Sequence, residues 1–201
     1  MRRLSQITES IWSDMQDRGS GESVKKEDQY VIEQIKEFVK RHVLLKEGDY
    51  EIVGLKLNLF ERVQIDEEDL VDGKFPFKFG SVYDFGAENI GLVSLENSPD
   101  EVKVDFVVNG NELTNFIGGP KYVGRTFTAN FNRNLESLDG SPEEVGNYSI
   151  TACQRVKDIK GITPVINGDL RVSTEEKQKY VFTDDDYRKY SKIRGQIIRR
   201  F

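Results

Sequence analysis

LVSLENSPDEV (residues 92–102), LTNFIGGPKYV (113–123) and LESLDGSPEEV (135–145) are three versions of one sequence unit. Each version opens with an apolar-x-x-apolar pattern and closes with Pro-x-x-Val. The closing valines are 21 and 22 residues apart, and the opening apolar residues, continued by Val156, are 21, 22 and 21 residues apart. Two patterns that keep one phase over this distance predict a repeat protein in which each unit forms one coil.

Short strand-like segments alternate with these units. They cover residues 105–108, 126–130 and 148–151. Amide side chains recur beside them: Asn89, Asn109, Asn111, Asn132 and Asn134. Such amides can bind backbone groups where the chain turns out of a strand. Because one coil cannot bury its own apolar stripe and stacked coils can, we predict a β-rich solenoid that is leucine-rich-repeat-like, with about 21–22 residues per coil and α-helical caps.

The repeats slip by single residues. The spacing from a valine to the first apolar residue of the next unit is 10 after Val82, 11 after Val102, 12 after Val123 and 11 after Val145. We expect the slips at turns or β-bulges, which accept an extra residue without displacing the stacked apolar column.

The segments outside the repeats are predicted to cap or extend the solenoid. The expected divisions are a flexible N-terminal segment (1–27), an N-terminal cap (28–74), the repeat solenoid (75–172) and a C-terminal cap (173–201). The first cap should hold an amphipathic helix over 28–43 and strands over 50–59 and 63–65. Thr183 should cap a short helix that ends near Tyr190, and residues 195–199 should add a last strand.

The first 15 residues carry an apolar stripe at helical spacing, formed by Leu4, Ile7, Ile11 and Met15 with Trp12 beside it. A polar linker with Gly19 and Gly21 follows. A short sticky helix on a tether is typical of a docking peptide. The alternative is that this helix folds back onto its own solenoid.

The repeats resemble a known group of sequences. GSV (80–82), SLENSPDEV (94–102) and SLDGSPEEVG (137–146) are similar to the short SLEGxPxxVGG repeats of leucine-rich-repeat-containing proteins from bacteria and their phages. Those proteins usually have Cys or Asn in the strand, and Cys153 is close to such a place. The resemblance implies a solenoid and a binding scaffold, and it implies no reaction. The opening, residues 4–16, resembles the starts of uncharacterised phage proteins of gut Bacteroides-type bacteria, which implies a virion or assembly contact.

Composition restricts the setting of the protein. Its 201 residues carry a net charge of -6 and one cysteine, and they contain no apolar run long enough to span a membrane. The N-terminus lacks the continuous apolar core of a signal peptide. A reducing compartment therefore fits best, with the protein cytoplasmic in a host cell or associated with a virion.

Catalytic chemistry has few candidates. His42 and Cys153 are the only residues of their types, and both are expected to be structural. The acidic runs 66–69 and 184–186 lack the spacing of a calcium loop. We expect no catalytic residue, no cofactor and no metal.

Nucleic-acid binding is a weaker alternative. It rests on basic residues near the C-terminus with aromatic residues among them. The basic residues are Arg188, Lys189, Lys192, Arg194, Arg199 and Arg200, and the aromatic ones are Tyr187, Tyr190 and Phe201.

The leading prediction is a non-enzymatic scaffold that binds a protein partner through its N-terminal helix or its outer strand face. The outward positions expected on that face are Asp105, Val107, Asn109, Arg125, Thr128, Asn130, Ser149 and Thr151. A minor virion or assembly component anchored by residues 1–15 is the alternative.

Overall fold

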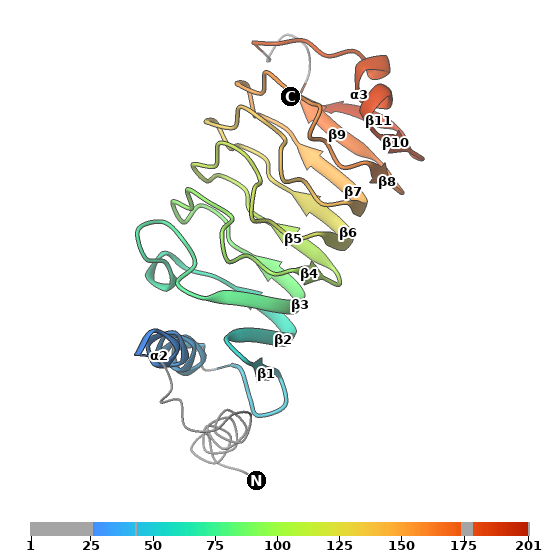
Figure 1. The fold of residues 1–201 in the computed structure, drawn as a ribbon. Coiled ribbons are helices and arrows are strands. Elements are labelled where there is room, and N and C mark those ends of the chain that lie inside the picture. The colour runs from blue at the N-terminus through green and yellow to red at the C-terminus, as the bar shows by residue number, and fades with distance from the viewer. Residues whose placement is uncertain (1–25, 43, 174–178, 201) are drawn as a thin grey trace.

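The computed structural model describes residues 26–42, 44–173 and 179–200. It is a β-solenoid of about five turns with few helices, which confirms the predicted fold class (Figure 1). The elements in chain order are α2 (Lys26–Arg41), β1 (Tyr50–Val53), β2 (Lys56–Gln64), the 3-10 helix η1 (Glu67–Asp69), β3 (Lys78–Gly86), β4 (Glu101–Val102), β5 (Asp105–Val107), β6 (Tyr122–Thr128), β7 (Glu144–Ile150), β8 (Val165–Ile166), β9 (Leu170–Ser173), α3 (Asp184–Tyr190), β10 (Lys192–Ile193) and β11 (Ile197–Arg200).

The strands form one sheet that runs the length of the stack. Apart from the antiparallel pair β1–β2, the paired strands are parallel, from β2 through to β10 and β11. Val102 lies opposite Val123, and Val145 lies opposite both Val123 and Ile166. The Pro-x-x-Val valines therefore stack as predicted. Parallel pairing extends beyond residues 75–172 at both ends, because β2 and β11 continue it.

One of the single-residue slips occurs at a bulge, as expected. Val82 and Phe85 are three positions apart, whereas the equivalent Val102 and Phe106 are four apart, so β4 and β5 are separated by a bulge. A register shift at the same place, after Val123, interrupts the pairing of β6 with β7. The extra residue is taken up between two stacked columns, and both columns stay aligned.

Rings fill the centre of the solenoid. Phe85, Phe106, Phe127 and Tyr148 are fully buried and stack in sequence, with ring centroids 5.4, 5.5 and 5.1 Å apart and interplanar angles of 10°, 18° and 11°. Each such aromatic pair contributes about 0.5–1.5 kcal/mol beyond the burial of its area. The column binds each coil to the next over the whole repeat region.

Each coil leaves its strand through a residue in the left-handed backbone region. Asn89, Gly110, Phe131 and Ala152 occupy this position, with φ of 56°, 67°, 59° and 57°. Glycine and asparagine adopt this conformation readily, and bulky residues rarely do. At Gly110 an added Cβ would also lie 2.0 Å from Asn89 Oδ1, so the Asn89 side chain would have to move to admit one.

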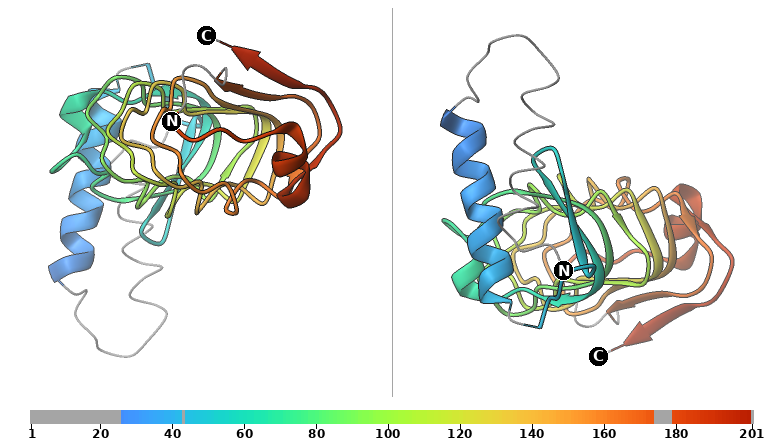
Figure 2. Two further views of the ribbon diagram at one scale, coloured as in Figure 1. Left: turned by 90° about the horizontal axis from the view of Figure 1, so that it is seen from above. Right: turned by 90° about the horizontal axis from the view of Figure 1, so that it is seen from below.

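The amphipathic helix predicted over 28–43 is α2. Acidic residues occupy its first turn and basic residues its last turn, which suits the helix dipole. Its apolar face packs against the N-terminal end of the stack (Figures 1 and 2), where Phe38 meets Phe77 and Phe79 edge-on at 5.5 Å. The helix thereby covers the first coil as a cap.

The C-terminal cap also follows the prediction. Thr183 Oγ1 accepts a hydrogen bond from Asp186 N at 3.2 Å, and Asp186 Oδ2 accepts one from Thr183 N at 2.8 Å, forming a capping box for α3. Tyr187 is buried, and β11 then pairs with β9 as the last strand. The predicted docking residues Leu4, Ile7, Ile11, Trp12 and Met15 lie outside the described residues.

Candidate interaction surface

The outer face of the sheet carries the strand positions that the sequence predicted. Asp105, Thr126 and Asn147 are paired neighbours along one row, and Val107, Thr128 and Ser149 along another. Their side chains point away from the core, because Phe106, Phe127 and Tyr148 between them point inward. The structure thus brings Asp105, Val107, Asn109, Arg125, Thr128 and Asn130 together on adjacent coils.

Two of the predicted contact residues are not available to a partner. Ser149 is only 5% exposed and Thr151 only 8%. Ser149 Oγ donates to Asn130 Oδ1 at 2.9 Å, and Thr151 N donates to the same oxygen at 2.7 Å. Both residues are thus bound to Asn130 of the preceding coil.

Charges on this face neutralise one another. Arg125 Nε donates to Asp105 Oδ1 at 2.7 Å, and Arg125 Nη2 donates to Asp105 Oδ2. These hydrogen bonds hold the pKa of Asp105 below its ordinary value. Burial raises the pKa of the neighbouring Asp84, with the charge of Asp105 as a further cause, while Arg62 and Arg125 oppose the shift. The ion pair between Arg125 and Asp105 therefore links two adjacent coils.

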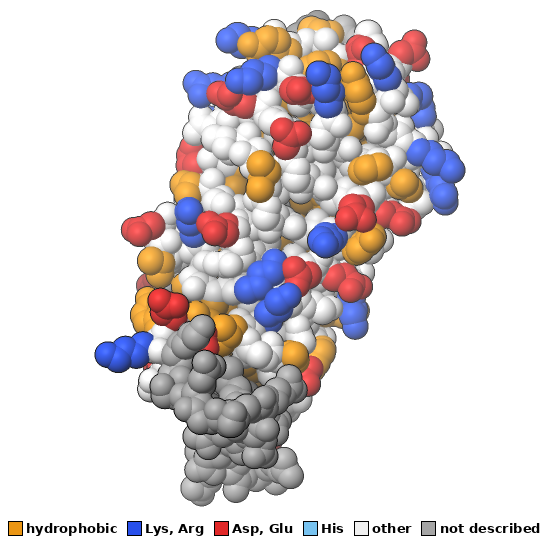
Figure 3. All heavy atoms as spheres, in the orientation of Figure 1, with side chains coloured by type: hydrophobic (Ala, Val, Ile, Leu, Met, Phe, Trp, Pro, Cys, Tyr) orange, Lys and Arg blue, Asp and Glu red, His pale blue; other side chains and the backbone are white. Residues whose placement is uncertain are grey.

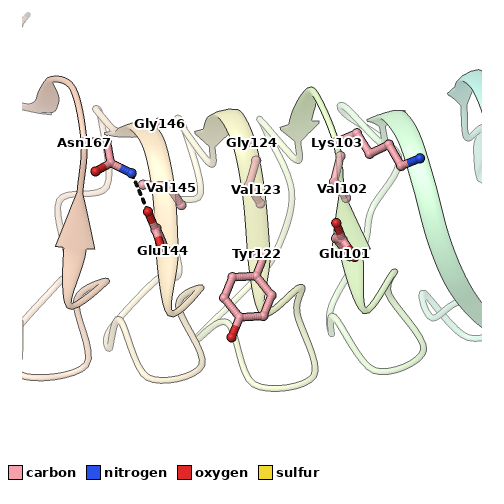
Figure 4. Close-up of a pocket in the computed structure, with 10 residues that line it drawn as sticks. All are labelled: Glu101, Val102, Lys103, Tyr122, Val123, Gly124, Glu144, Val145, Gly146 and Asn167. Carbon is pink, nitrogen blue, oxygen red and sulfur yellow. Dashed lines mark hydrogen bonds between the residues drawn. The ribbon is translucent and has the colours of Figure 1, made fainter.

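A shallow groove of about 340 Å³ crosses the sheet at the bulge (Figure 4). Its floor includes Gly124 and Gly146. A Cβ at Gly124 would lie 2.2 Å from Lys103 O, and a Cβ at Gly146 would lie 2.3 Å from Arg125 O. The glycines are therefore required by the close approach of the backbones, and the lack of side chains at these positions leaves the groove open.

Two of the polar residues that line the groove, Tyr122 and Asn167, are hydrogen-bonded to glutamates. Tyr122 Oη donates to Glu143 Oε2 at 3.0 Å, and Asn167 Nδ2 donates to Glu144 Oε1 at 2.6 Å. No histidine, cysteine or serine is among the groove residues.

Phe131 is a surface residue that the sequence reasoning missed. Its side chain is 55% exposed, and its φ of 59° is the left-handed conformation described above. Arg133, also exposed, follows two positions later. Alignment of the repeats at residues 89, 110, 131 and 152 shows a phenylalanine where the other coils have Asn, Gly and Ala. That signal was present in the sequence.

His42 has a structural environment. Its Nε2 lies 2.9 Å from Asp69 Oδ2, and Arg41 Nη2 donates to Asp69 Oδ1 at 2.9 Å. Burial raises the pKa of Asp69, but hydrogen bonds from His42, Asp66 N and Arg41 outweigh it and the net pKa is lowered. The cluster fastens the end of α2 to η1. Sequence reasoning did not identify Asp69, because it lies 27 positions from His42.

Cys153 belongs to a column of buried polar residues. Asn111 Nδ2 donates to Ala87 O at 2.7 Å, Asn132 Nδ2 donates to Val108 O at 3.0 Å, and Cys153 Sγ lies 3.2 Å from Ala129 O. Burial raises the pKa of the Cys153 thiol to about 12. The thiol is therefore protonated at neutral pH and does not act as a nucleophile.

Of the aromatic residues in the C-terminal basic stretch, Tyr187 is buried and Tyr190 is partly exposed. Tyr187 is 1% exposed, and Arg188 Nη1 is bound to Ile193 O at 3.0 Å. Arg199 Nη2 reaches Asp184 Oδ1 at 2.7 Å. Phe201 lies outside the described residues.

Two other features are absent from the described part of the chain. No cluster of three or more His, Cys, Asp or Glu side chains is arranged to hold a metal ion there. None of the helices described is both long and apolar enough to cross a membrane.

No known protein family, curated protein or solved structure matches the chain. The fold itself supplies the class: this is a β-solenoid protein with a helix at each end of the stack.

Proposed function

We propose that this chain is a non-enzymatic scaffold that binds a protein partner through the outer strand face and the adjoining turn at Phe131. The observation that carries the proposal is Phe131 itself. A non-glycine residue in the left-handed region costs roughly 1–2 kcal/mol, and an exposed ring recovers little of it. Strain of this kind is characteristic of functional positions.

The surroundings of Phe131 suit a protein ligand. Aromatic and arginine side chains dominate the binding energy of protein interfaces, and Phe131 lies close in sequence to the exposed Arg133. Thr128 and Asn130 precede it on the same coil and are partly exposed. Open solenoid faces provide broad surfaces that bind other proteins.

The test is crosslinked affinity purification from the native host with the full chain, read by mass spectrometry. We expect the Phe131→Asn variant to lose the partner. The control is Phe60→Asn, which removes a phenylalanine of similar exposure, 46%, from β2. If Phe131→Asn retains the partner, the proposed surface is wrong.

The second candidate is a minor virion or assembly component anchored by residues 1–15. The resemblance of residues 4–16 to phage protein openings supports it. A full-length variant with Ile11→Ser and Trp12→Ser tests it. If this variant loses the partner and Phe131→Asn retains it, the N-terminal segment carries the binding. Both candidates place the protein inside a host cell or on a particle.

A further inference from the structure

The sheet ends in an exposed edge strand at each end of the solenoid. β1 pairs only with β2, and β11 pairs only with β9, among the strands described. A strand paired on one side leaves a row of backbone N–H and C=O groups able to pair with another strand. β1 and β11 each have four residues, so the two edges match in length.

The two edges carry opposite charge. Near the C-terminal edge, Lys192, Arg194 and Arg200 are exposed and form no ion pair with the described residues. Figure 3 shows Lys and Arg side chains gathered on the side of the molecule where β10 lies. On and before β1, Glu47 and Glu51 are exposed and likewise have no ion-pair partner within the described ranges; the exposed Lys46 offsets one of these two charges.

Charges on edge strands often serve only to prevent sheets from joining. Like charges at two edges that meet oppose their pairing most strongly. When copies of one chain approach end to end, the C-terminal edge of one meets the N-terminal edge of the next. Opposite signs at these edges attract, so they favour the contact that edge charges normally prevent.

The side chains also match in register. On β1, Glu51 and Val53 point outward, because Tyr50 and Ile52 lie opposite the buried Leu59 and Leu57. On β11, Ile198 and Arg200 point outward, since Ile197 and Arg199 lie opposite the buried Leu170 and Val172.

β1 runs antiparallel to the rest of the stack, so it would meet β11 of another copy in antiparallel pairing. In that orientation, placing Glu51 opposite Arg200 also places Val53 opposite Ile198. Opposite charges and apolar pairs directly across two strands are both stabilising.

We propose that copies of this chain associate head to tail, with β11 of one copy pairing with β1 of the next, Glu51 opposite Arg200. The contact joins different surfaces of the two copies, so it continues into a row of solenoids unless rotation closes it into a ring. This assembly is independent of the surface around Phe131.

Sedimentation velocity of the purified full chain over a concentration series tests the proposal. At low salt we expect species larger than the monomer that grow with concentration. High salt should dissociate them, because it screens exposed charges. A chain that stays monomeric at low salt throughout the series overturns the proposal, and it would leave β11 as an edge for a strand of some other protein.

Charge exchange identifies the contact. Glu51→Lys and Arg200→Glu each place like charges at the interface, so each variant alone should be monomeric. The double variant restores opposite charges and should associate again. An equimolar mixture of the two single variants should also associate, in rows where the two variants alternate, because both contacts between unlike variants join opposite charges.

Matched controls carry the same charge changes elsewhere. Glu61→Lys, on β2, and Lys103→Glu, in the middle of the stack, alter exposed residues away from the two edges. Both should associate as the unmodified chain does, and thermal melts should show that every variant is folded. A double variant that remains monomeric while folded would refute the proposed register.

Discussion

At the scale of single residues, replacing Phe131 should change binding and stability in opposite directions: the variant should bind its partner less well and be more stable. Replacing it with Asn keeps the left-handed turn and relieves the strain of a bulky residue there. We expect the free energy of unfolding to rise by about 1 kcal/mol, measured by urea denaturation. Phe60→Asn should not raise stability, since nothing marks its backbone as strained. A loss of stability in Phe131→Asn would show that the ring packs in a stabilising way.

Asn111 illustrates how single amides connect coils. Its Oδ1 accepts from Ile90 N and Leu92 N, both at 3.1 Å, and its Nδ2 donates to Ala87 O and Val108 O. A leucine would fill the space and leave these four buried backbone groups without side-chain partners.

We therefore expect Asn111→Leu to lower the free energy of unfolding by at least about 3 kcal/mol, since each unsatisfied buried group costs roughly 1–3 kcal/mol. Urea denaturation followed by circular dichroism measures it. The matched variant Asn132→Leu should cost less, because Oδ1 of Asn132 has no hydrogen-bond partner. Equal losses would mean that the accepted hydrogen bonds of Asn111 contribute little.

At the scale of elements, the cap helix α2 is held by a carboxylate that should make stability depend on pH. The net pKa of Asp69 is lowered: burial raises it, but hydrogen bonds from His42, Asp66 N and Arg41 prevail. A carboxyl whose folded pKa is depressed stabilises the fold above its unfolded pKa, and this contribution is lost as pH falls through the folded value.

Asp69→Asn should therefore lower stability at pH 7 by about 2 kcal/mol, the scale of hydrogen bonds to a charged group. The difference in the free energy of unfolding between this variant and the unmodified chain should narrow as the pH falls below about 4. Denaturation curves from pH 7 to 3 measure both effects. The control is Glu68→Gln, which removes an exposed carboxyl in the same turn. It should change neither the stability at pH 7 nor the dependence of stability on pH. A gap that is constant with pH would contradict the assignment.

The elements also show what the sequence could predict. The recurring Val102, Val123 and Val145 revealed the stacking, and Thr183 with its aspartates located α3, because both signals are local or strictly periodic. Other features depend on contacts between distant residues. The pairing of His42 with Asp69 and the burial of Ser149 and Thr151 need the neighbouring coil in place. The strained turn at Phe131 was visible in the repeat alignment and was overlooked.

The whole molecule should tolerate removal of a complete coil. Each coil contacts mainly its neighbours, and Val102 and Val123 occupy equivalent positions. Deletion of residues 102–122 joins Glu101 to Val123 in phase and places Phe85 against Phe127. We expect this variant to fold cooperatively with a lower Tm, seen by circular dichroism. Deletion of 102–119 breaks the phase and should give an unfolded or aggregated chain. If both deletions fold equally well, the coils are not equivalent.

The parallel register of the sheet has a mechanical consequence. The hydrogen bonds between coils point along the axis of the stack, so tension applied between its two ends loads them one rung at a time. Tension along a strand would instead load all the rungs together. Under tension along the axis of the stack, the coils should detach one after another. Each coil of about 21 residues should release roughly 70 Å of chain before the next one detaches. Such a domain yields at low force and lengthens in equal steps, as an extensible link between the structures at its two ends would.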